Sequence, residues 1–472
     1  MKRRTKIVCT LGPSSSSPER IASLIASGMD VARVNFSHGD HPTHERTIRY
    51  VREAAAEADQ PVAVLADLQG PKIRVGALPR PVELETGDSI VFAPEGEQRG
   101  GELPTTYGAL ATDVEVGDVV LLADGLMELI VEDIRERRVR MRVIHGGTLG
   151  SHKGINLPGV RVSIASLLEK DLRDLRFALE QGVDYVGLSF VREAEDVHQL
   201  ASRIPAGGPL IVVKIEKGLA LNNLKPILEA SAAAMVARGD LGVELPFEQV
   251  PLAQKRMIQL ANIYSRPVIT ATQMLESMIE NPRPTRAEAS DVANAIIDGT
   301  DAVMLSAETA TGKFPMEAVK SMVRIAQEIE DSHILESGPH YDIPIAPRDD
   351  GFTPTERAIA GATVEAVRRL DAPLIVTFTR SGFTARVVSS FRPPVPILAI
   401  SDAPRTYNQL ALVWGVVPVL CDPEPSFEAM LACARRSAVE RGLAKPGDRV
   451  VVTAGLPMNV PGTTNFLRVE VV

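Results

Sequence analysis

The sequence predicts an α/β fold built on a (β/α)8 TIM barrel, with a β-barrel-like lid domain inserted after the third barrel strand and an α/β domain at the C-terminus. Three observations predict it. Eight short apolar runs alternate with amphipathic stretches. The alternation is interrupted once, by strand-and-turn sequence that holds no long helix. Another α/β pattern follows a segment rich in proline and aspartate that begins after about residue 335.

Length and composition restrict the classes of protein to consider. A chain of 472 residues has room for roughly two to four domains. The formal net charge of -9 excludes the electrostatic footprint of a general nucleic-acid binder. No stretch reaches the ~18–20 apolar residues of a membrane span, and the basic N-terminal segment holds too short an apolar run for a secretory signal. Cys9, Cys421 and Cys433 lack metal-ligand spacing, so we expect reduced thiols and a cytoplasmic location.

The barrel strands are the eight apolar runs, and capping signals mark helices between them. Ser17 suits an N-cap, with Pro18 at the first helical position and Gly28 as the stop. Thr285 and Glu288 have the spacing of a capping box. The runs are KIVCTLG (6–12), VARVNF (31–36), VAVLAD (62–67), DYVGLSF (184–190), LIVVKIE (210–216), AAAMVARG (232–239), PVITATQ (267–273) and DAVMLSAE (301–308).

These patterns divide the chain into three domains. We assign residues 1–70 and 166–335 to the catalytic barrel, 71–165 to the inserted β lid and 350–472 to a C-terminal α/β regulatory domain. The insertion follows a strand's carboxyl end, the face on which barrels hold their active sites. A β module at this place is expected to close over the substrate.

The strongest candidate site lies at the ends of the fifth and sixth barrel strands. Lys214 and Glu216 are two residues apart, so their side chains point to one face, and Asp240 ends the neighbouring strand. Two close carboxylates suit a divalent ion, Mg²⁺ or Mn²⁺. The alternative is that one carboxylate caps a helix while the other pairs with Lys217.

Two catalytic roles fit Lys214. It could form a Schiff base, or it could stay charged and stabilise a transferring phosphoryl group or an enolate. The adjacent metal site favours the second role, and a structural ion pair with Glu216 is the non-catalytic alternative.

Other strand ends supply weaker signals at the same barrel mouth. Arg33 suits a phosphate, and Thr272 suits a carboxylate or a proton relay. His38 is more often a structural hydrogen bonder, and a surface lysine such as Lys153 is usually only solvated. Because these residues are expected at the same end of the barrel, we treat them together as candidates for one active site.

Long motifs in this chain resemble those of pyruvate kinase. They include GMDVARVNFSHGDH, GSHKGINLPG, VVKIEKG, ARGDLGVELP, TATQMLESM and PRPTRAEASDVANAIIDGTDAVMLSAETATGKFP. The resemblance covers essentially the whole chain. It implies a glycolytic phosphotransferase that converts phosphoenolpyruvate and ADP to pyruvate and ATP, requires magnesium, is allosteric and forms a homotetramer.

The resemblance also implies roles for single residues. Lys214 matches the lysine that stabilises the phosphoryl group and the enolate, and Glu216 and Asp240 match the metal ligands. The substrate-binding positions implied are Arg33, Gly239, Asp240 and Thr272. The nucleotide- and phosphate-binding positions implied are Arg74, Lys153 and His38. The ligands implied for a monovalent cation, normally K⁺, are Asn35, Ser37, Asp67 and the backbone of Leu68.

The stretch VLADLQGPKIRVG (64–76) departs from the commoner family pattern, which has Glu where this chain has Lys72. Leu68, Gln69 and Lys72 together resemble the K⁺-independent branch of the family. Our hypothesis is that the Lys72 ammonium replaces K⁺, which is then not required. The alternative is that Lys72 points to solvent and K⁺ binds as usual.

The C-terminal domain contains a candidate effector turn, defined by Thr379, Ser381, Gly382 and Thr384. Such a turn before a helix can bind a phosphate through backbone N–H groups, and the resemblance implies a sugar-phosphate or nucleotide effector here. A capped helix without a ligand is the alternative. Two rival functions remain at this point: a barrel aldolase of Schiff-base or metal-dependent type, and a catalytically inactive effector sensor.

Overall fold

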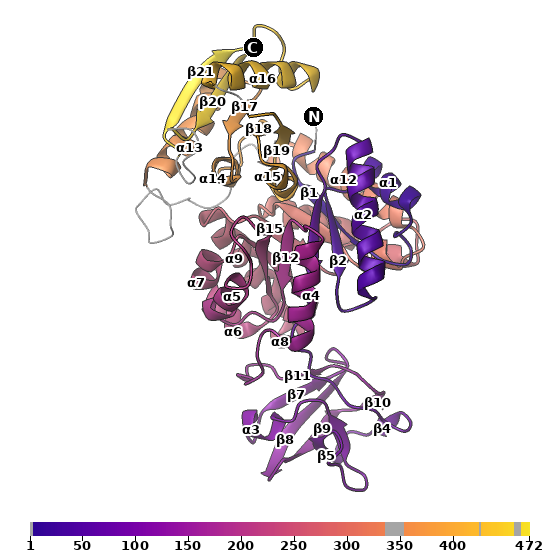
Figure 1. Cartoon of the computed structure of the whole chain (residues 1–472). Coiled ribbons are helices and arrows are strands. Elements are labelled where there is room, and N and C mark those ends of the chain that lie inside the picture. Colours follow the sequence, from indigo (N-terminus) through magenta and orange to yellow (C-terminus); the bar gives the residue numbers. More distant parts are fainter. Residues whose placement is uncertain (1–2, 336–353, 424–425, 457–463) are drawn as a thin grey trace.

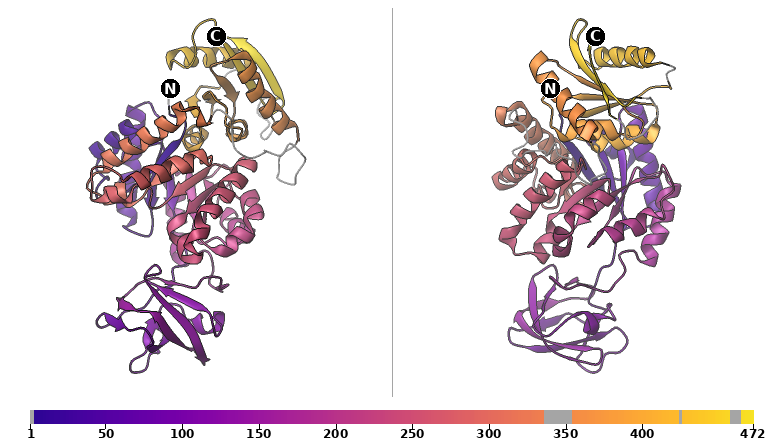
Figure 2. Two further views of the ribbon diagram at one scale, coloured as in Figure 1. Left: turned by 180° about the vertical axis from the view of Figure 1, so that it is seen from behind. Right: turned by 90° about the vertical axis from the view of Figure 1, so that its left-hand side faces the viewer.

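Three bodies follow one another along the long axis of the molecule, with the barrel in the middle (Figures 1 and 2). The β-rich lid lies at one end and the C-terminal α/β domain at the other. The computed structural model describes residues 3–335, 354–423, 426–456 and 464–472. The Pro- and Asp-rich linker expected at 337–351 lies outside the described residues.

The eight predicted barrel runs all form strands of one closed parallel barrel, which confirms that prediction. The barrel order is β1-β16-β15-β14-β13-β12-β3-β2. These strands are β1 (Lys6–Leu11), β2 (Val31–Asn35), β3 (Ala63–Asp67), β12 (Tyr185–Leu188), β13 (Leu210–Ile215), β14 (Ala233–Ala237), β15 (Val268–Ala271) and β16 (Ala302–Leu305). Their side chains are almost all buried because helices cover the outside and other barrel residues fill the inside.

The predicted capping signals work as expected. The Ser17 side chain accepts a hydrogen bond from the backbone of Arg20, Pro18 opens the helix, and Gly28 ends it at a φ of 120°. Thr285 and Glu288 form a complete capping box. The barrel helices are α1 (Pro18–Ser27), α2 (His41–Glu57), α4 (Glu169–Glu180), α5 (Ala194–Ala201), α6 (Gly218–Asn222), α7 (Leu224–Ala230), α8 (Arg238–Glu244), α9 (Val250–Ile263), α10 (Arg286–Ile297), α11 (Ala307–Ala310) and α12 (Pro315–Asp331), with short 3-10 turns η1 (Phe247–Gln249), η2 (Glu276–Ile279) and η3 (His333–Leu335).

The lid is a separate β structure between β3 and α4. A six-stranded sheet has the order β11-β7-β8-β9-β5-β6, and β10 pairs with β4. Val139, Met141 and Val143 of β9 face the lid core while Arg140 and Arg142 face outward, the alternation of a half-buried strand. Its elements are β4 (Val82–Leu84), β5 (Ser89–Pro94), β6 (Leu103–Thr105), α3 (Leu110–Asp113), β7 (Val119–Leu122), β8 (Met127–Arg135), β9 (Arg138–His145), β10 (Gly147–Leu149) and β11 (Ile155–Asn156).

The C-terminal domain is a five-stranded sheet in the order β19-β18-β17-β20-β21, with only β21 antiparallel. This sheet with its helices confirms the α/β pattern expected after the linker. The fold brings Cys421, just after β19, close to Cys433 of α16, with their Cα atoms 7.3 Å apart, which is longer than a disulfide usually spans. Cys9 is buried and free. The expectation of reduced thiols stays a prediction. The elements are α13 (Pro354–Leu370), β17 (Ile375–Phe378), α14 (Phe383–Ser390), β18 (Ile397–Ser401), α15 (Pro404–Gln409), η4 (Leu410–Leu412), β19 (Val416–Leu420), α16 (Phe427–Glu440), β20 (Arg449–Ala454) and β21 (Phe466–Val471).

The C-terminal domain closes the amino end of the barrel. Ala411 and Leu412 of η4 pack into the apolar cluster inside the barrel, beside Tyr185. The Tyr185 hydroxyl donates to the carbonyl of Gln409 at 2.7 Å. The opposite, carboxyl end of the barrel faces the lid (Figure 1). Among the described residues, no helix is long and apolar enough to span a membrane.

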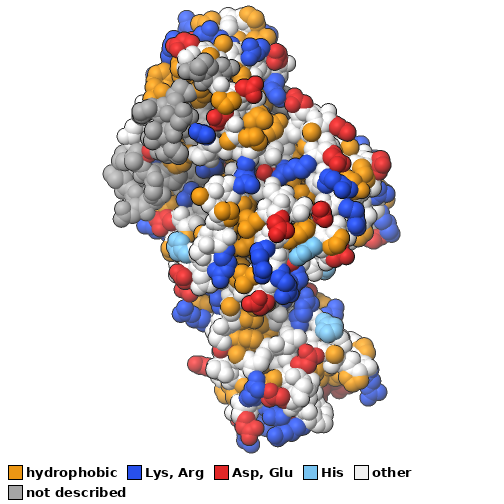
Figure 3. Space-filling model, in the orientation of Figure 1, with side chains coloured by type: hydrophobic (Ala, Val, Ile, Leu, Met, Phe, Trp, Pro, Cys, Tyr) orange, Lys and Arg blue, Asp and Glu red, His pale blue; other side chains and the backbone are white. Residues whose placement is uncertain are grey.

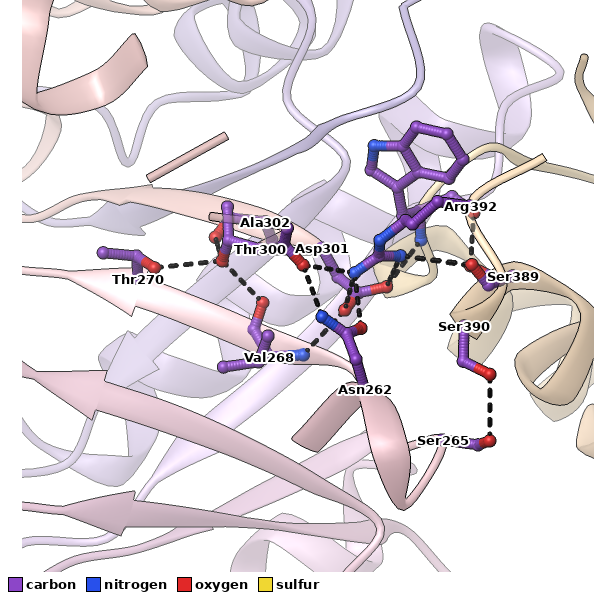
Figure 4. A network of polar contacts seen from close by, with 12 residues as sticks. Asn262, Ser265, Val268, Thr270, Thr300, Asp301, Ala302, Ser389, Ser390 and Arg392 are labelled. Atoms are coloured by element: carbon purple, nitrogen blue, oxygen red, sulfur yellow. Dashed lines mark hydrogen bonds and ion pairs between the residues drawn. The ribbon is translucent and has the colours of Figure 1, made fainter. Parts of the chain in front are cut away.

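A buried polar network fastens the C-terminal domain to the barrel (Figure 4). Arg392, just after α14, pairs with both carboxylate oxygens of Asp301 at 3.0 and 2.9 Å and donates to Asn262 at 2.7 Å. The backbone of Trp414 donates to Asp301, and the guanidinium groups of Arg4 and Arg392 each lie 5.1 Å from the Trp414 ring. Cation–π contacts and a shared carboxylate thus join three separate chain segments.

Candidate active site

Lys214 lies between two buried carboxylates at the carboxyl end of the barrel. Its Nζ is 2.9 Å from Glu216 Oε1 and 3.4 Å from Asp67 Oδ1, and it donates to the Ser189 hydroxyl at 2.9 Å. Both carboxylate side chains are only 1% exposed. Strand β13 ends here, so the alternation of the strand directs Lys214 inward and the chain then turns away.

This surrounding keeps the lysine charged. Burial alone would lower the pKa of Lys214, but the neighbouring Asp67 and Glu216 charges outweigh it, so the pKa is raised above its usual value. Schiff-base formation needs a neutral amine, which this arrangement opposes. A permanently charged ammonium instead suits the stabilisation of negative charge that develops during a reaction.

Glu216 and Asp240 form the candidate metal position. Burial raises the pKa of Glu216, the Lys214 charge opposes that rise, and the Asp240 charge adds to it. Asp240 lies in the first turn of α8 and lines a cleft below the lid. Two carboxylates fit Mg²⁺, whose remaining ligands are commonly water and substrate oxygens. The described residues offer no group of three or more His, Cys, Asp or Glu for a closed metal cage.

Thr272 and Gly239 lie together beside this pair. The Thr272 backbone has a φ of 69°, and its hydroxyl accepts from the N–H of Gly239 at 2.8 Å. Arg238 Nη2 donates to the Thr272 carbonyl at 2.7 Å, and its Nη1 bonds Asp291 at 2.7 Å. A positive φ in a β-branched residue needs such support from its surroundings. Sequence reasoning missed both Arg238 and Ser189, although each lies inside a quoted motif or strand run.

Arg33 neutralises Asp67 from the other side. Its Nε donates to Asp67 Oδ2 at 2.8 Å and its Nη1 donates to Thr10 at 2.9 Å. Burial raises the pKa of Asp67, but the Lys214 and Arg33 charges outweigh burial and leave that pKa below its usual value. Asp67 therefore carries a negative charge that two protein cations already balance.

The residues expected at a monovalent-cation position make contacts within the protein. Asn35 Oδ1 accepts from the backbone of Ser37 at 3.0 Å. The Leu68 carbonyl accepts from Ser189 at 2.7 Å. Together with Asp67, these groups lie at the adjacent ends of β2 and β3, where the register pairs Asn35 with Asp67.

The cleft between barrel and lid is rich in cations. Lys72, Arg74 and Lys153 line it from the hinge and the lid, and Asp240 and Lys217 line it from the barrel. Arg74 Nη1 donates to the carbonyl of His152 at 2.8 Å, which fixes its position. Figure 3 shows Lys and Arg side chains gathered near the narrow junction of these bodies. Lys72 and Lys153 are exposed, as suits groups that meet a ligand from solvent.

Two predicted positions lie away from this cleft. His38 is exposed in the loop after β2 and is absent from the residues that line the cleft. The candidate effector turn lies in the C-terminal domain, where Gly382 precedes α14 with a φ of 75°. Ser381 is exposed, while Thr379 is buried and Thr384 bonds Thr464 at 2.8 Å.

A barrel with a lid, a charged buried lysine and nearby carboxylates fits an enzyme of the phosphotransferase class. The family model of the pyruvate kinase barrel domain matches residues 2–319, and that of the pyruvate kinase alpha/beta domain matches residues 357–470. The chain belongs to the pyruvate kinase family.

Known relatives agree over the full length of the chain. Pyruvate kinase 2 of Synechocystis is 46% identical over 480 residues, covering 100% of this chain and 80% of the relative. Pyruvate kinase of Mycobacterium intracellulare is 46% identical over 475 residues, covering 100% and 98%. The crystal structure of a Cryptosporidium parvum pyruvate kinase has a TM-score of 0.90 at 37% identity, covering 99% of this chain and 96% of that one.

The activity follows from this membership. The chain is a kinase that transfers the phosphoryl group of phosphoenolpyruvate to ADP, and its family requires a divalent metal ion. Neither a barrel aldolase nor an inactive effector sensor is favoured, because the relatives are pyruvate kinases over the whole chain.

Proposed function

We propose that the cluster around Lys214 carries out the phosphoryl transfer. The observation that carries this proposal is the charged Lys214 ammonium held between Glu216 and Asp67. Phosphoryl transfer depends mainly on positioning and on neutralising the charge of the transferring group. Lys214 would stabilise that charge and then the enolate that remains when the phosphoryl group leaves.

The neighbouring residues bind and orient the substrate in this proposal. Arg33 supplies a phosphate contact, and the Gly239 backbone and Thr272 receive the carboxylate end. Thr272 would pass a proton toward the enolate carbon through water. Glu216 and Asp240 would hold Mg²⁺, or Mn²⁺, and a bound divalent ion supplies further neutralisation of phosphoryl oxygens.

The nucleotide is proposed to bind in the cleft below the lid. Arg74 and Lys153 are its phosphate contacts, because both line the cleft and both carry positive charge. His38, which the family resemblance also implies, lies in the exposed loop after β2 and would contribute only from the edge of the site.

A K⁺ ion is proposed not to be required. Arg33 and Lys214 already balance the charge of Asp67, and Lys72 brings a further ammonium to the cleft. Full activity in tetramethylammonium buffer, unchanged by KCl, would support this, whereas activity that appears only with KCl would refute it. Lys72→Glu should create a K⁺ requirement, and Lys445→Glu, on the exposed surface of the C-terminal domain, should not.

Further properties are proposed from the family alone: a homotetramer, an effector of sugar-phosphate or nucleotide type at the turn before α14, and a cytoplasmic location that suits glycolysis. The turn at Gly382, with a φ of 75°, directly precedes α14, and Ser381 beside it is exposed, which is compatible with a phosphate at the start of this helix.

The decisive test of the metal site is direct binding. Asp240→Asn should weaken Mn²⁺ binding, which electron paramagnetic resonance measures directly. It should also lower the rate of pyruvate formation at a fixed Mg²⁺ concentration. The exposed Asp331→Asn serves as the matched control. Unchanged Mn²⁺ affinity in Asp240→Asn would remove this carboxylate from the metal site.

A further inference from the structure

The chain segment that returns from the lid to the barrel contacts both bodies. We call residues 157–168, between β11 and α4, the returning strap. Arg192 of the barrel donates from Nη1 to the carbonyls of Val162 and Ile164 at 2.8 and 3.1 Å. Between them, the Ser163 N–H donates to Asp113 of the lid at 2.6 Å. Three consecutive residues thus alternate between a barrel anchor and a lid anchor.

The barrel anchor is itself held firmly. Arg192 Nη2 pairs with Asp196 at 3.2 Å, and the Arg192 backbone N–H donates to the same carboxylate at 2.9 Å. Asn223 donates to the Arg192 carbonyl at 3.0 Å. The Arg192 side chain is largely buried, so little conformational freedom remains at this end.

The lid anchor is tied to the lid core. The Tyr107 hydroxyl donates to Asp113 and also accepts from the Ser163 N–H at 3.1 Å. Tyr107 is 6% exposed and belongs to the apolar core of the lid. Burial, and then the hydrogen bond to Asp113, raise the pKa of Tyr107, so the phenol remains a donor at neutral pH. Movement of the lid core therefore moves the returning strap with it.

The strap also borders the nucleotide cleft. Arg192, Val162 and Ile164 line the cleft, whereas Asp113 and Ser163 are not among its lining residues. The outgoing segment also contacts both bodies, but its anchors are spread along the chain: the Gly70 N–H donates to Asp171 of the barrel at 3.0 Å, and the Ile73 carbonyl accepts from the Ile155 N–H of the lid at 2.9 Å. In the returning strap the barrel and lid anchors fall on adjacent residues, so the strap couples the two bodies over the shorter length of chain.

We propose that Arg192 and Asp113 are positioning residues that, through the returning strap, hold the lid and the barrel in register for nucleotide binding. The inference rests on the proposed binding of ADP in this cleft. A nucleotide that bridges two bodies binds more weakly when it must also order them. Phosphoenolpyruvate is bound by barrel residues and should be indifferent to the strap.

The test compares Arg192→Met, Asp113→Ala and the double variant by steady-state kinetics and by hydrogen exchange. Each single variant should raise KM for ADP about tenfold, the scale of a lost hydrogen bond to a charged group. The KM for phosphoenolpyruvate should stay within about twofold, and backbone exchange over 157–168 should quicken in both. The double variant should be little worse than either single one, because both residues act on one strap.

The control is Arg161→Met. Arg161 lies on the same strap and pairs with Glu193 at 3.3 Å, but both side chains are well exposed, so its loss should change nothing measurable.

A raised KM for ADP in Arg192→Met but not in Asp113→Ala would overturn the proposal, because Arg192 would then touch the nucleotide itself. An equal effect on both substrates would also overturn it. If the unmodified enzyme fails to make pyruvate from phosphoenolpyruvate and ADP, the proposed function fails instead.

Discussion

At the scale of single residues, Lys214 is a buried cation held between two carboxylates of opposite charge. Lys214→Met should lower the rate of pyruvate formation by about 10²- to 10³-fold, the loss typical when one stabilising donor is removed from a transition state. The KM for ADP should change little, since Lys214 does not line the nucleotide cleft.

A misfolded variant would mimic this loss, because Lys214→Met leaves two buried carboxylates with one cation fewer. Circular dichroism and a thermal melt of the variant separate the two causes. Retention of near-normal turnover in a folded variant would exclude the proposed role of Lys214.

Another residue, His44 of α2, links pH to stability. Burial lowers the pKa of His44, whose ring packs 4.6 Å from that of Phe36. The folded state therefore prefers the neutral ring, whereas the unfolded chain takes up a proton at about pH 6.5. Its contribution to the free energy of unfolding is present above pH ~6.5 and is lost as the pH falls toward the lower folded pKa.

Urea unfolding at pH 7.5 and pH 5.5 measures this effect. The stability difference between the two pH values should shrink in His44→Leu and persist in His145→Gln, whose ring is exposed in the lid. An unchanged difference in His44→Leu would mean that other groups dominate this pH range.

Single-residue chemistry was predicted well where a residue follows a barrel strand. Lys214, Glu216 and Asp240 could be grouped from sequence because parallel strands of a barrel deliver their carboxyl ends to one face. Ser189 and Arg238 were missed because a serine or an arginine beside a strand carries no signal until its partners are known. The Asp67 charge balance was equally hidden, since Arg33 and Lys214 reach it from different strands.

At the scale of elements, the start of α10 supports the loop that holds Thr272. The Glu288 carboxylate bonds the Thr285 backbone at 2.8 Å and also the backbone and hydroxyl of Ser277 in η2, at 2.7 and 2.6 Å. One capping box thereby joins a helix to the turn that follows β15.

Removing the cap tests this connection. Thr285→Ala should lower the free energy of unfolding by about 1 kcal/mol, as is usual for a lost N-cap hydroxyl, whereas Thr285→Ser should retain most of the stability. Chemical denaturation of both variants gives the comparison, and equal stability of the two would show that the hydroxyl is dispensable here.

Elements were predicted more reliably than their arrangement. Apolar runs located all eight barrel strands because both faces of each strand are buried. The lid was predicted as β structure from strand-and-turn sequence that holds no long helix, yet the order β11-β7-β8-β9-β5-β6 could not be predicted, because such a pattern shows where strands lie in the sequence and not which strand lies beside which. The domain boundaries at residues 70 and 165 stay predictions.

At the scale of the whole molecule, Arg392 and Asp301 connect the C-terminal domain to the barrel. Arg392→Met would leave the Asp301 carboxylate buried without its guanidinium partner, which should cost about 3–5 kcal/mol of unfolding free energy. The chain has one tryptophan, Trp414, and it lies against this pair, so its fluorescence reports the junction during denaturation.

Two further variants give this prediction its controls. Adding Asp301→Asn to Arg392→Met removes the stranded charge and should recover part of the loss. Arg369→Met breaks an exposed pair with Glu365 on α13 and should cost no more than about 0.5 kcal/mol. A loss in Arg392→Met as small as that of Arg369→Met would mean that the junction depends on apolar packing alone.

The plug formed by Ala411 and Leu412 has a consequence for protein engineering. Residues of η4 fill part of the interior of the barrel. The barrel and lid therefore cannot be separated from the C-terminal domain at the linker without leaving the barrel interior incomplete. A chimera that takes its C-terminal domain from a relative must carry residues that fill the amino end of the barrel equally well, or else change the side chain of Tyr185, which packs in the same cluster as Ala411 and Leu412 and bonds the Gln409 carbonyl. Recombination between relatives should therefore tolerate crossovers within the lid far better than crossovers between the barrel and its plug.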